Sequence, residues 1–463
     1  MNGTTSRRGF FARAAMIGAG TAVPALVSQR ADAAETSFPT NFTPQDISFM
    51  DQYYYGSLEI ARGIRDTQVG AIAAAMEKAY ELKSKGGKVV AHVNYGHYAM
   101  FAGAKGRPGQ PWVLPEPGIT PTKEEFAALN KGDFLITSRV DEQGKSLRGR
   151  GVYVVGVTNN YYKFAKTPPD GLVPRRMETS IEEISDMVID SQVPWNNGLV
   201  SAPQIPQVKL CPSSGLAQFL VYWACTASFA NLIGTKGKGS SSKPAEDYLD
   251  MAIERFEMIG TDRPKIDWVA EKWADLVLGK KARLLLYGRR MTDETYSPTG
   301  SSNMFVNDAV YCASSTMIAD NYDNVADTIT PNDIVVVTSY TSDHPDEMNV
   351  ARRVKNIGAY TVSFGPYATD GDSSGPRLFK LVDDAFTCYS DESAGVITVP
   401  GFPEKVSPLT GLTGNLIHWM LTAQWTDHMA RRGEMPYYWQ GAHENGGREY
   451  GNAIRPLFLE RGY

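Results

Sequence analysis

The stretch D-I-V-V-V-T-S-Y-T-S, Asp333 to Ser342, places a short apolar run directly before a cluster of hydroxyl side chains. A helical pattern follows through Ala351. An apolar run without alternation is typical of a strand that is buried on both faces of a parallel sheet. Such sheets bind ligands at the carboxyl ends of their strands, and a helix start there adds unpaired N–H groups and a positive dipole end. We therefore expect the hydroxyl cluster to contact an anionic or hydroxylated ligand.

The same residues have a second interpretation as an ordinary helix start. Asp343 or Ser342 would cap the helix, and Pro345 would occupy its first turn. Taken alone, the loop leaves both interpretations open.

Similar apolar runs recur along the chain and are separated by segments of helix length. This alternation predicts an α/β protein whose parallel sheets are covered by helices on both faces. The other expected strands are 89–93, 134–138, 152–157, 187–190, 283–287 and 358–364, and the expected helices are 57–84, 266–278 and 412–431.

The chain also contains an internal repeat. The pattern P-x-x-G-L-x-x-x-L-x-x-W occurs at 212–223 and again, without a gap, at 408–419. The strand and hydroxyls of 133–138 match those of 333–339 in the same order. A chance likeness of two amphipathic helices does not explain several matches in one order. We expect two tandem α/β domains, 45–240 and 246–463, joined near a Gly/Ser/Lys-rich stretch.

The N-terminal residues have the features of an export signal. Arg7 and Arg8 form a twin-arginine pair, a weakly apolar run follows, and 31–33 is a small-x-small cleavage sequence. This order predicts a Tat signal peptide at 1–33 and a periplasmic or extracellular mature protein without a stable membrane span. A short N-terminal helix with incidental arginines is the alternative.

Charge and cysteine content exclude some functions. The net charge of −5 becomes about −8 when the signal, with its four arginines and one aspartate, is removed. We therefore expect no nucleic-acid partner. The four cysteines form no C-x-x-C pair, so we expect no metal site and assume no disulfide.

The order of these segments resembles the sugar isomerase (SIS) domain over nearly the whole mature chain. The resemblance rests on the strand and hydroxyl loop followed by Gly-Ala-x-x-x-x-Phe. It also rests on four further segments, which are 88–97, 184–194, 212–214 and 444–452. It implies two tandem SIS-like domains of the flavodoxin or Rossmann-like type, a possible homodimer, and a Ser/Thr loop that holds the phosphate of a phosphosugar.

The resemblance also implies candidate site residues. Aldose–ketose isomerisation needs a base that moves a proton between C1 and C2 and a group that opens the ring, for which histidine is suited, and it needs no cofactor or metal. The implied catalytic residues are His97, Glu449 and Glu347. The implied ligand-binding residues are Ser339, Tyr340, Thr341, Ser342, His344, Gly96, Ser138, Ser213 and Ser214.

Several positions depart from the family pattern. Tyr98 stands where a serine is usual, charged residues follow Ser138, and Arg448 replaces an aspartate in the terminal motif. Glu347 also suits a helix first turn, where an acid is favoured by the dipole. Two functions therefore stay open: a carbohydrate-derivative-binding protein with isomerase activity, and a catalytically inactive binding or structural protein of the same fold.

Overall fold

The computed structural model describes residues 47–92, 126–138, 142–158, 181–194, 197–287, 304–305, 328–339, 341–366, 376–390, 395–439 and 446–463. The expected signal peptide and the loop that contains Gly96 and His97 lie outside these residues.

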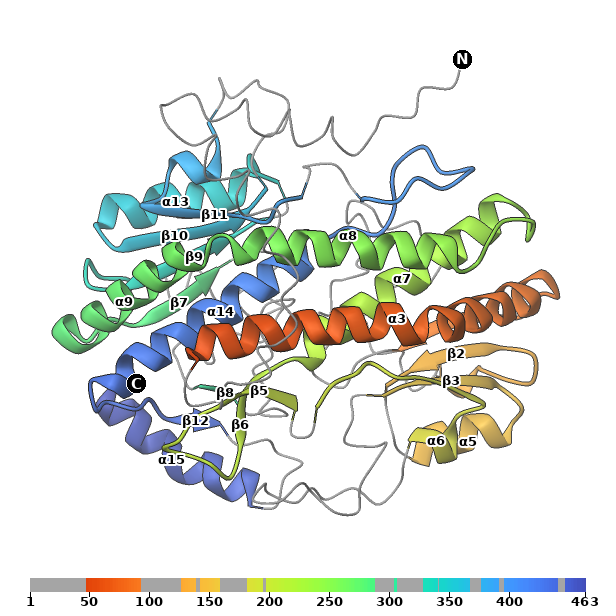
Figure 1. Ribbon diagram of the computed structural model, residues 1–463, viewed down its shortest axis with the longest axis horizontal. Helices are drawn as coiled ribbons and strands as arrows, with labels where there is room; N and C mark the ends of the chain where they lie inside the picture. The colour runs from red at the N-terminus through yellow and green to blue at the C-terminus, as the bar shows by residue number, and fades with distance from the viewer. Residues whose placement is uncertain are drawn as a thin grey trace.

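The first half of the chain forms a parallel sheet with the strand order β1-β2-β3-β4. Helix α3 lies on one face, and α5 and α6 lie on the other (Figure 1). The central strand pair is buried except at Tyr153, as expected from its continuous apolar sequence. The elements are α3 (Phe49–Ser84), β1 (Val89–His92), β2 (Phe134–Thr137), α5 (Glu142–Gly149), β3 (Tyr153–Val157), α6 (Ile181–Ile184) and β4 (Met187–Ile189).

The second half forms an equivalent parallel sheet with the order β11-β10-β9-β7. Helix α13 covers one face, and α9 and α14 lie on the other (Figure 1). The fold class expected from the sequence is therefore confirmed. The elements are α9 (Arg263–Lys280), β7 (Leu284–Tyr287), β9 (Ile334–Thr338), α13 (Pro345–Ile357), β10 (Tyr360–Gly365), β11 (Asp384–Thr387) and α14 (Thr410–Arg431).

Two buried helices, α7 (Ser214–Gly234) and α14, form the centre of the molecule. Helix α7 is long and apolar enough to cross a membrane, but 94% of its apolar window is buried in the fold, which makes it a core helix. Helix α3 packs against both α7 and α14, and α8 (Lys243–Gly260) packs against α7. Helices from the two halves thus cover one another, and one continuous apolar core includes residues of both.

The two halves use matching hydrogen bonds. Tyr53 of α3 donates to the carbonyl of Pro212 at 3.1 Å, and Tyr248 of α8 donates to the carbonyl of Pro408 at 3.2 Å. Each bond satisfies a buried carbonyl just before a core helix. Asp133 and Asp333 also have matching roles, because each carboxylate accepts backbone N–H groups beside the first strands of its sheet.

Smaller elements complete the described chain. They are the antiparallel pair β5 (Gly198–Ser201) and β6 (Lys209–Pro212), the antiparallel pair β8 (Met304–Phe305) and β12 (Tyr438–Trp439), the short helix η3 (Leu378–Lys380), and α15 (Gly447–Arg461).

One helix prediction needs correction, and one helix was not predicted. The helix expected at 57–84 begins at Phe49, where the Ser48 hydroxyl accepts the N–H of Asp51 at 3.1 Å. Tyrosines 53 and 54 are buried and continue its apolar face. Helix α8 was not predicted, although its buried residues recur at helical spacing.

Two helix-terminal glycines should respond to alanine in opposite ways. A Cβ at Gly234, the last residue of α7, would lie 1.7 Å from the carbonyl oxygen of Pro400, so Gly234→Ala should destabilise the protein by about 2 kcal/mol or more. A Cβ at Gly279 in α9 would meet nothing within 4 Å, so Gly279→Ala should stabilise by about 0.5 to 1 kcal/mol. Chemical denaturation would measure both. Changes of the same sign would contradict this packing.

Candidate functional site

The carboxyl edge of the second sheet holds the hydroxyl cluster that the sequence indicated. Strand β9 ends at Thr338, whose hydroxyl donates to the carbonyl of Tyr287 at 3.5 Å. The N–H of Ser339 extends the sheet by donating to the Phe364 carbonyl at 3.0 Å. The Ser339 hydroxyl in turn accepts the N–H of Thr341 at 3.4 Å. Both hydroxyls therefore fix the loop, and Tyr340 lies outside the described residues.

Ser342 is held by an arginine that the sequence did not single out. Arg377 donates from Nη1 to the Ser342 hydroxyl at 3.1 Å and lies 3.4 Å from the carboxylate of Asp343. The Ser342 carbonyl accepts the N–H of Leu378 at 2.6 Å. The guanidinium side chain is only 17% exposed, so it is fixed beside the loop.

Helix α13 begins immediately after this loop. Its N-cap is His344, followed by Pro345 at the first position, so the expectation of Pro345 in the first turn is confirmed. The prediction that Asp343 or Ser342 caps the helix is wrong, because neither residue is at the N-cap position. The extended backbone continues one residue further, and the Ser342 hydroxyl is instead engaged by Arg377.

His344 and Glu347 form a pair at this helix start. The side chain of Glu347 is 3% exposed and its carboxylate contacts Nδ1 of His344, whose side chain is 45% exposed. A carboxylate next to one nitrogen of an imidazole makes the two residues candidates for an acid–base pair.

The candidate residues of the first half have different surroundings. Ser138 is buried at the end of β2. Asn197 accepts the N–H groups of Ser213 and Ser214 at 3.2 and 2.6 Å and donates to the Ser214 hydroxyl at 2.7 Å. These bonds satisfy the start of α7, where the N-cap Ser213 makes no side-chain cap. A ligand-binding role for the three serines stays a prediction.

Glu449 lies on an exposed position of α15, which packs against β12. Figure 1 shows α15 and α13 at well-separated places, so the structure does not bring Glu449 and Glu347 together. His97 and Gly96 lie outside the described residues. Of the candidate residues, the structure gathers Ser339, Thr341, Ser342, His344 and Glu347 at one edge, and it adds Arg377.

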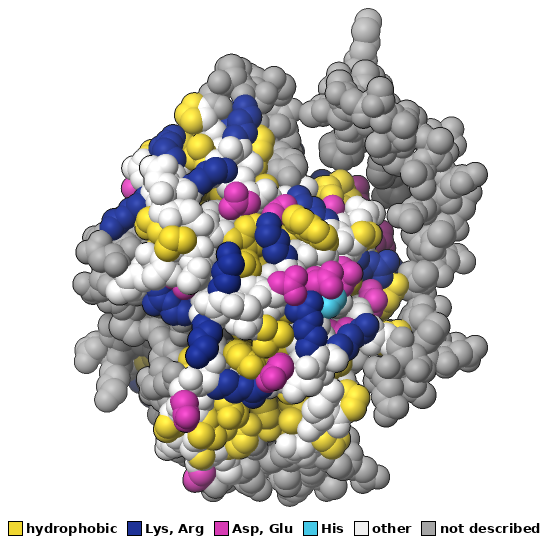
Figure 2. Space-filling view, turned by 90° about the vertical axis from the view of Figure 1, so that its left-hand side faces the viewer, with side chains coloured by type: hydrophobic (Ala, Val, Ile, Leu, Met, Phe, Trp, Pro, Cys, Tyr) yellow, Lys and Arg dark blue, Asp and Glu magenta, His cyan; other side chains and the backbone are white. Residues whose placement is uncertain are grey.

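The surface on the side of the molecule where α9 ends and β7 begins is of mixed charge. Figure 2 shows lysine and arginine side chains interspersed with acidic ones over the described part of this face.

The fold defines an α/β protein, and the edge described here is a candidate ligand site at the carboxyl end of a parallel sheet. No protein-family model matches the chain, and no curated protein matches it in sequence. Solved structures resemble it in fold. One is the C-terminal domain of glucosamine-fructose-6-phosphate aminotransferase from Francisella tularensis, at 10% identity and a TM-score of 0.45, covering 83% of this chain and 98% of that one.

A second similar structure is tagatose-6-phosphate ketose/aldose isomerase from Escherichia coli, at 11% identity and a TM-score of 0.43, covering 86% of this chain and 97% of that one. Likenesses of this size carry no inference about ligand or reaction. The fold described above rests on the strand pairings of the chain itself.

Another histidine, His418 of α14, is buried in the core, and burial lowers its pKa to about 3. The imidazole is therefore neutral in the folded protein, while the unfolded chain takes up a proton below about pH 6.5. The unfolded state then binds more protons, so stability should fall as pH decreases from 6.5 toward 3, by at most about 1.4 kcal/mol per pH unit from this group.

Replacing His418 with glutamine should remove this part of the pH dependence. The measurement is the free energy of unfolding between pH 7 and 5 for wild type and His418→Gln. His428→Gln is the control on the same helix, because His428 is partly exposed and bonds to Asp267 at 2.8 Å. An unchanged slope in His418→Gln would show that this histidine is not buried neutral.

Proposed function

We propose that the protein binds a carbohydrate derivative, a phosphosugar or a related anionic sugar, at the carboxyl edge of the second sheet. The observation that carries the proposal is Arg377, fixed on the Ser342 hydroxyl beside the N-terminus of α13. An arginine fork and a helix N-terminus both favour an anionic group. The ordered resemblance to the SIS domain supports a sugar as the remainder of the ligand.

The contact between Arg377 and Asp343 is a long one. Its separation of 3.4 Å is longer than the 2.7 to 2.9 Å of a strong charge-assisted hydrogen bond. A phosphate or carboxylate group of the ligand would displace this weak contact. Thr341, which is partly exposed, and the first N–H groups of α13 would complete the anion's surroundings.

The His344–Glu347 pair supports isomerisation as an extension of this proposal. Nε2 of His344 would open the sugar ring or carry the proton between C1 and C2, while buried Glu347 would hold the ring and its tautomer. A catalytically inactive binding protein of the same fold is the alternative. Export through the predicted Tat signal, a periplasmic location and a homodimer belong to the same proposal.

Binding can be tested by thermal shift with fructose 6-phosphate and glucose 6-phosphate, using the free sugars as comparison. A phosphorylated sugar should raise the melting temperature of wild type, because a ligand that binds only the folded state stabilises it. Arg377→Met should weaken binding about tenfold or more, the size expected for a lost charge-assisted hydrogen bond. Arg377→Lys should recover only part of it, because lysine keeps the charge but loses the fork.

The matched control is Arg352→Met, which removes another cation from α13. Arg352 bonds to Asn349 on the exposed side of the helix. If Arg352→Met and Arg377→Met weaken sugar binding equally, binding depends on the net positive charge of this region and not on the position of Arg377. Absence of any shift in the folded wild-type protein would refute binding of these sugars.

Isomerisation can be tested by NMR in D₂O with whichever sugar binds. Wild type should incorporate deuterium at C2, and His344→Asn should lower the exchange rate at least about a hundredfold, the usual share of a general acid–base group. Glu347→Gln should lower it less, because it acts through the histidine. If His344→Asn exchanges as fast as wild type while still binding the sugar, His344 does not transfer the proton.

A further inference from the structure

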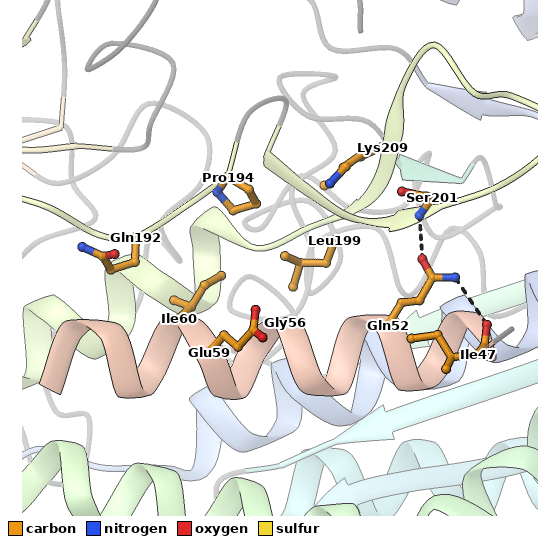
Figure 3. A pocket seen from close by; sticks show the side chains of 11 residues that line it. Ile47, Gln52, Gly56, Glu59, Ile60, Gln192, Pro194, Leu199, Ser201 and Lys209 are labelled. Carbon is orange, nitrogen blue, oxygen red and sulfur yellow. Dashed lines mark hydrogen bonds between the residues drawn. The ribbon is translucent and has the colours of Figure 1, made fainter. Parts of the chain in front are cut away.

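A pocket of about 370 Å³ lies between α3 and the β5–β6 hairpin in the first half of the molecule (Figure 3). It is separate from the loop of Arg377 and Ser342, which belongs to the second sheet. Its size suits a small molecule. Ile60 and Leu199 give it apolar walls, and Ile47 and Pro194 extend them.

Two glycines of α3 shape this pocket. A Cβ at Gly56 would lie 3.1 Å from Leu199 Cδ2, and a Cβ at Gly63 would lie 3.2 Å from Gln192 Cγ. Leu199 and Gln192 therefore rest directly on the helix backbone. Larger residues at 56 and 63 would push the hairpin and Gln192 away and occupy the space between.

The duplicated helix of the second half carries larger residues at these positions. Tyr53 and Tyr248 make the same hydrogen bond in the two halves and so align α3 with α8. Gly56 and Gly63, three and ten residues after Tyr53, then correspond to Met251 and Met258. Only the first half has glycines at these two positions. The pocket is therefore a feature of this half and not of the repeated fold.

Opposite charges enter the pocket from opposite walls. Figure 3 shows the Glu59 carboxylate rising from α3 and the Lys209 side chain reaching in from β6. Within the described residues, neither side chain makes a hydrogen bond or an ion pair. The side-chain amide of Gln192 and the Ser201 hydroxyl also line the space, and neither group bonds to another described residue. Gln52, by contrast, accepts the N–H of Ser201 at 2.8 Å and is fixed.

We propose that this pocket binds a small zwitterion, a molecule with an ammonium group and a carboxylate joined by a short apolar chain. Glu59 would bind the ammonium group and Lys209 the carboxylate, while Ile60 and Leu199 contact the chain between them. Two charges held apart across an apolar gap match a ligand with the same two charges in reverse order. Gln192 and Ser201 supply further hydrogen bonds to its ends.

The test is calorimetric titration of the full chain with the ω-amino acids glycine, β-alanine, 4-aminobutyrate and 6-aminohexanoate. One chain length should bind best, because the hydrogen bond from the Ser201 N–H to Gln52 holds the hairpin on α3. Butylamine and butyrate, which each carry one charge, should bind about tenfold more weakly or worse, since each loses one charge-assisted contact.

Variants locate the binding. Glu59→Gln and Lys209→Met should each weaken the best zwitterion about tenfold or more. Gly56→Met, which introduces the residue of the second half, should abolish binding. Gly70→Ala is the control on the same helix, because a Cβ there meets nothing within 4 Å, and it should bind normally.

The outcome is independent of the sugar proposal. Arg377→Met should leave zwitterion binding unchanged, so failure of one proposal does not imply failure of the other. The zwitterion proposal is overturned if no member of the series binds the folded wild-type chain. It is also overturned if binding survives both Glu59→Gln and Lys209→Met.

Discussion

The burial of α7 and α14 is the constraint on which the rest of the structure depends. Both helices are buried around nearly their whole circumference, so each is covered on all sides by other elements. One half of the chain cannot do this alone. Helix α3 therefore packs on the core helices of both halves, and Met50 at its start donates to the side chain of Gln424 in α14 at 3.4 Å. The two sheets are placed by this shared centre, and the carboxyl edges of their strands with them.

The side chains of the strand-end loop have a structural role beside the binding role proposed for it. The hydroxyls of Thr338 and Ser339 satisfy backbone groups where the sheet ends. Because these bonds fix the loop, the first turn of α13 and the guanidinium of Arg377 are held in one arrangement before any ligand arrives. Preorganisation of this kind lowers the entropy cost of binding. Asp333 contributes from the opposite end of β9, since its carboxylate binds Arg283 and the N–H of Thr330.

Much of the sheet architecture was predictable, because buried parallel strands are short apolar runs and their signal is local. The hydroxyl loop was found for the same reason. Arg377 was not, since it comes 35 residues after Ser342 and only the fold brings the two together. The role of Asn197 could not be predicted for the same reason, because it accepts the N–H of Ser213 from 16 residues upstream. Helix α8 does have a helical pattern in its sequence. The role of the α3 glycines, by contrast, depends on their contacts with Leu199 and Gln192, which only the fold creates.

The bond between Met50 and Gln424 spans 374 residues and has a consequence for biosynthesis. A ribosome adds about 5 to 20 residues per second, so the first helix waits roughly 20 to 75 s before its last partner exists. Helices α7 and α8 emerge earlier and can cover only part of its apolar surface. The part of the α3 apolar surface that packs on α14 therefore stays exposed for most of the synthesis of the chain. A chaperone can bind it during that interval.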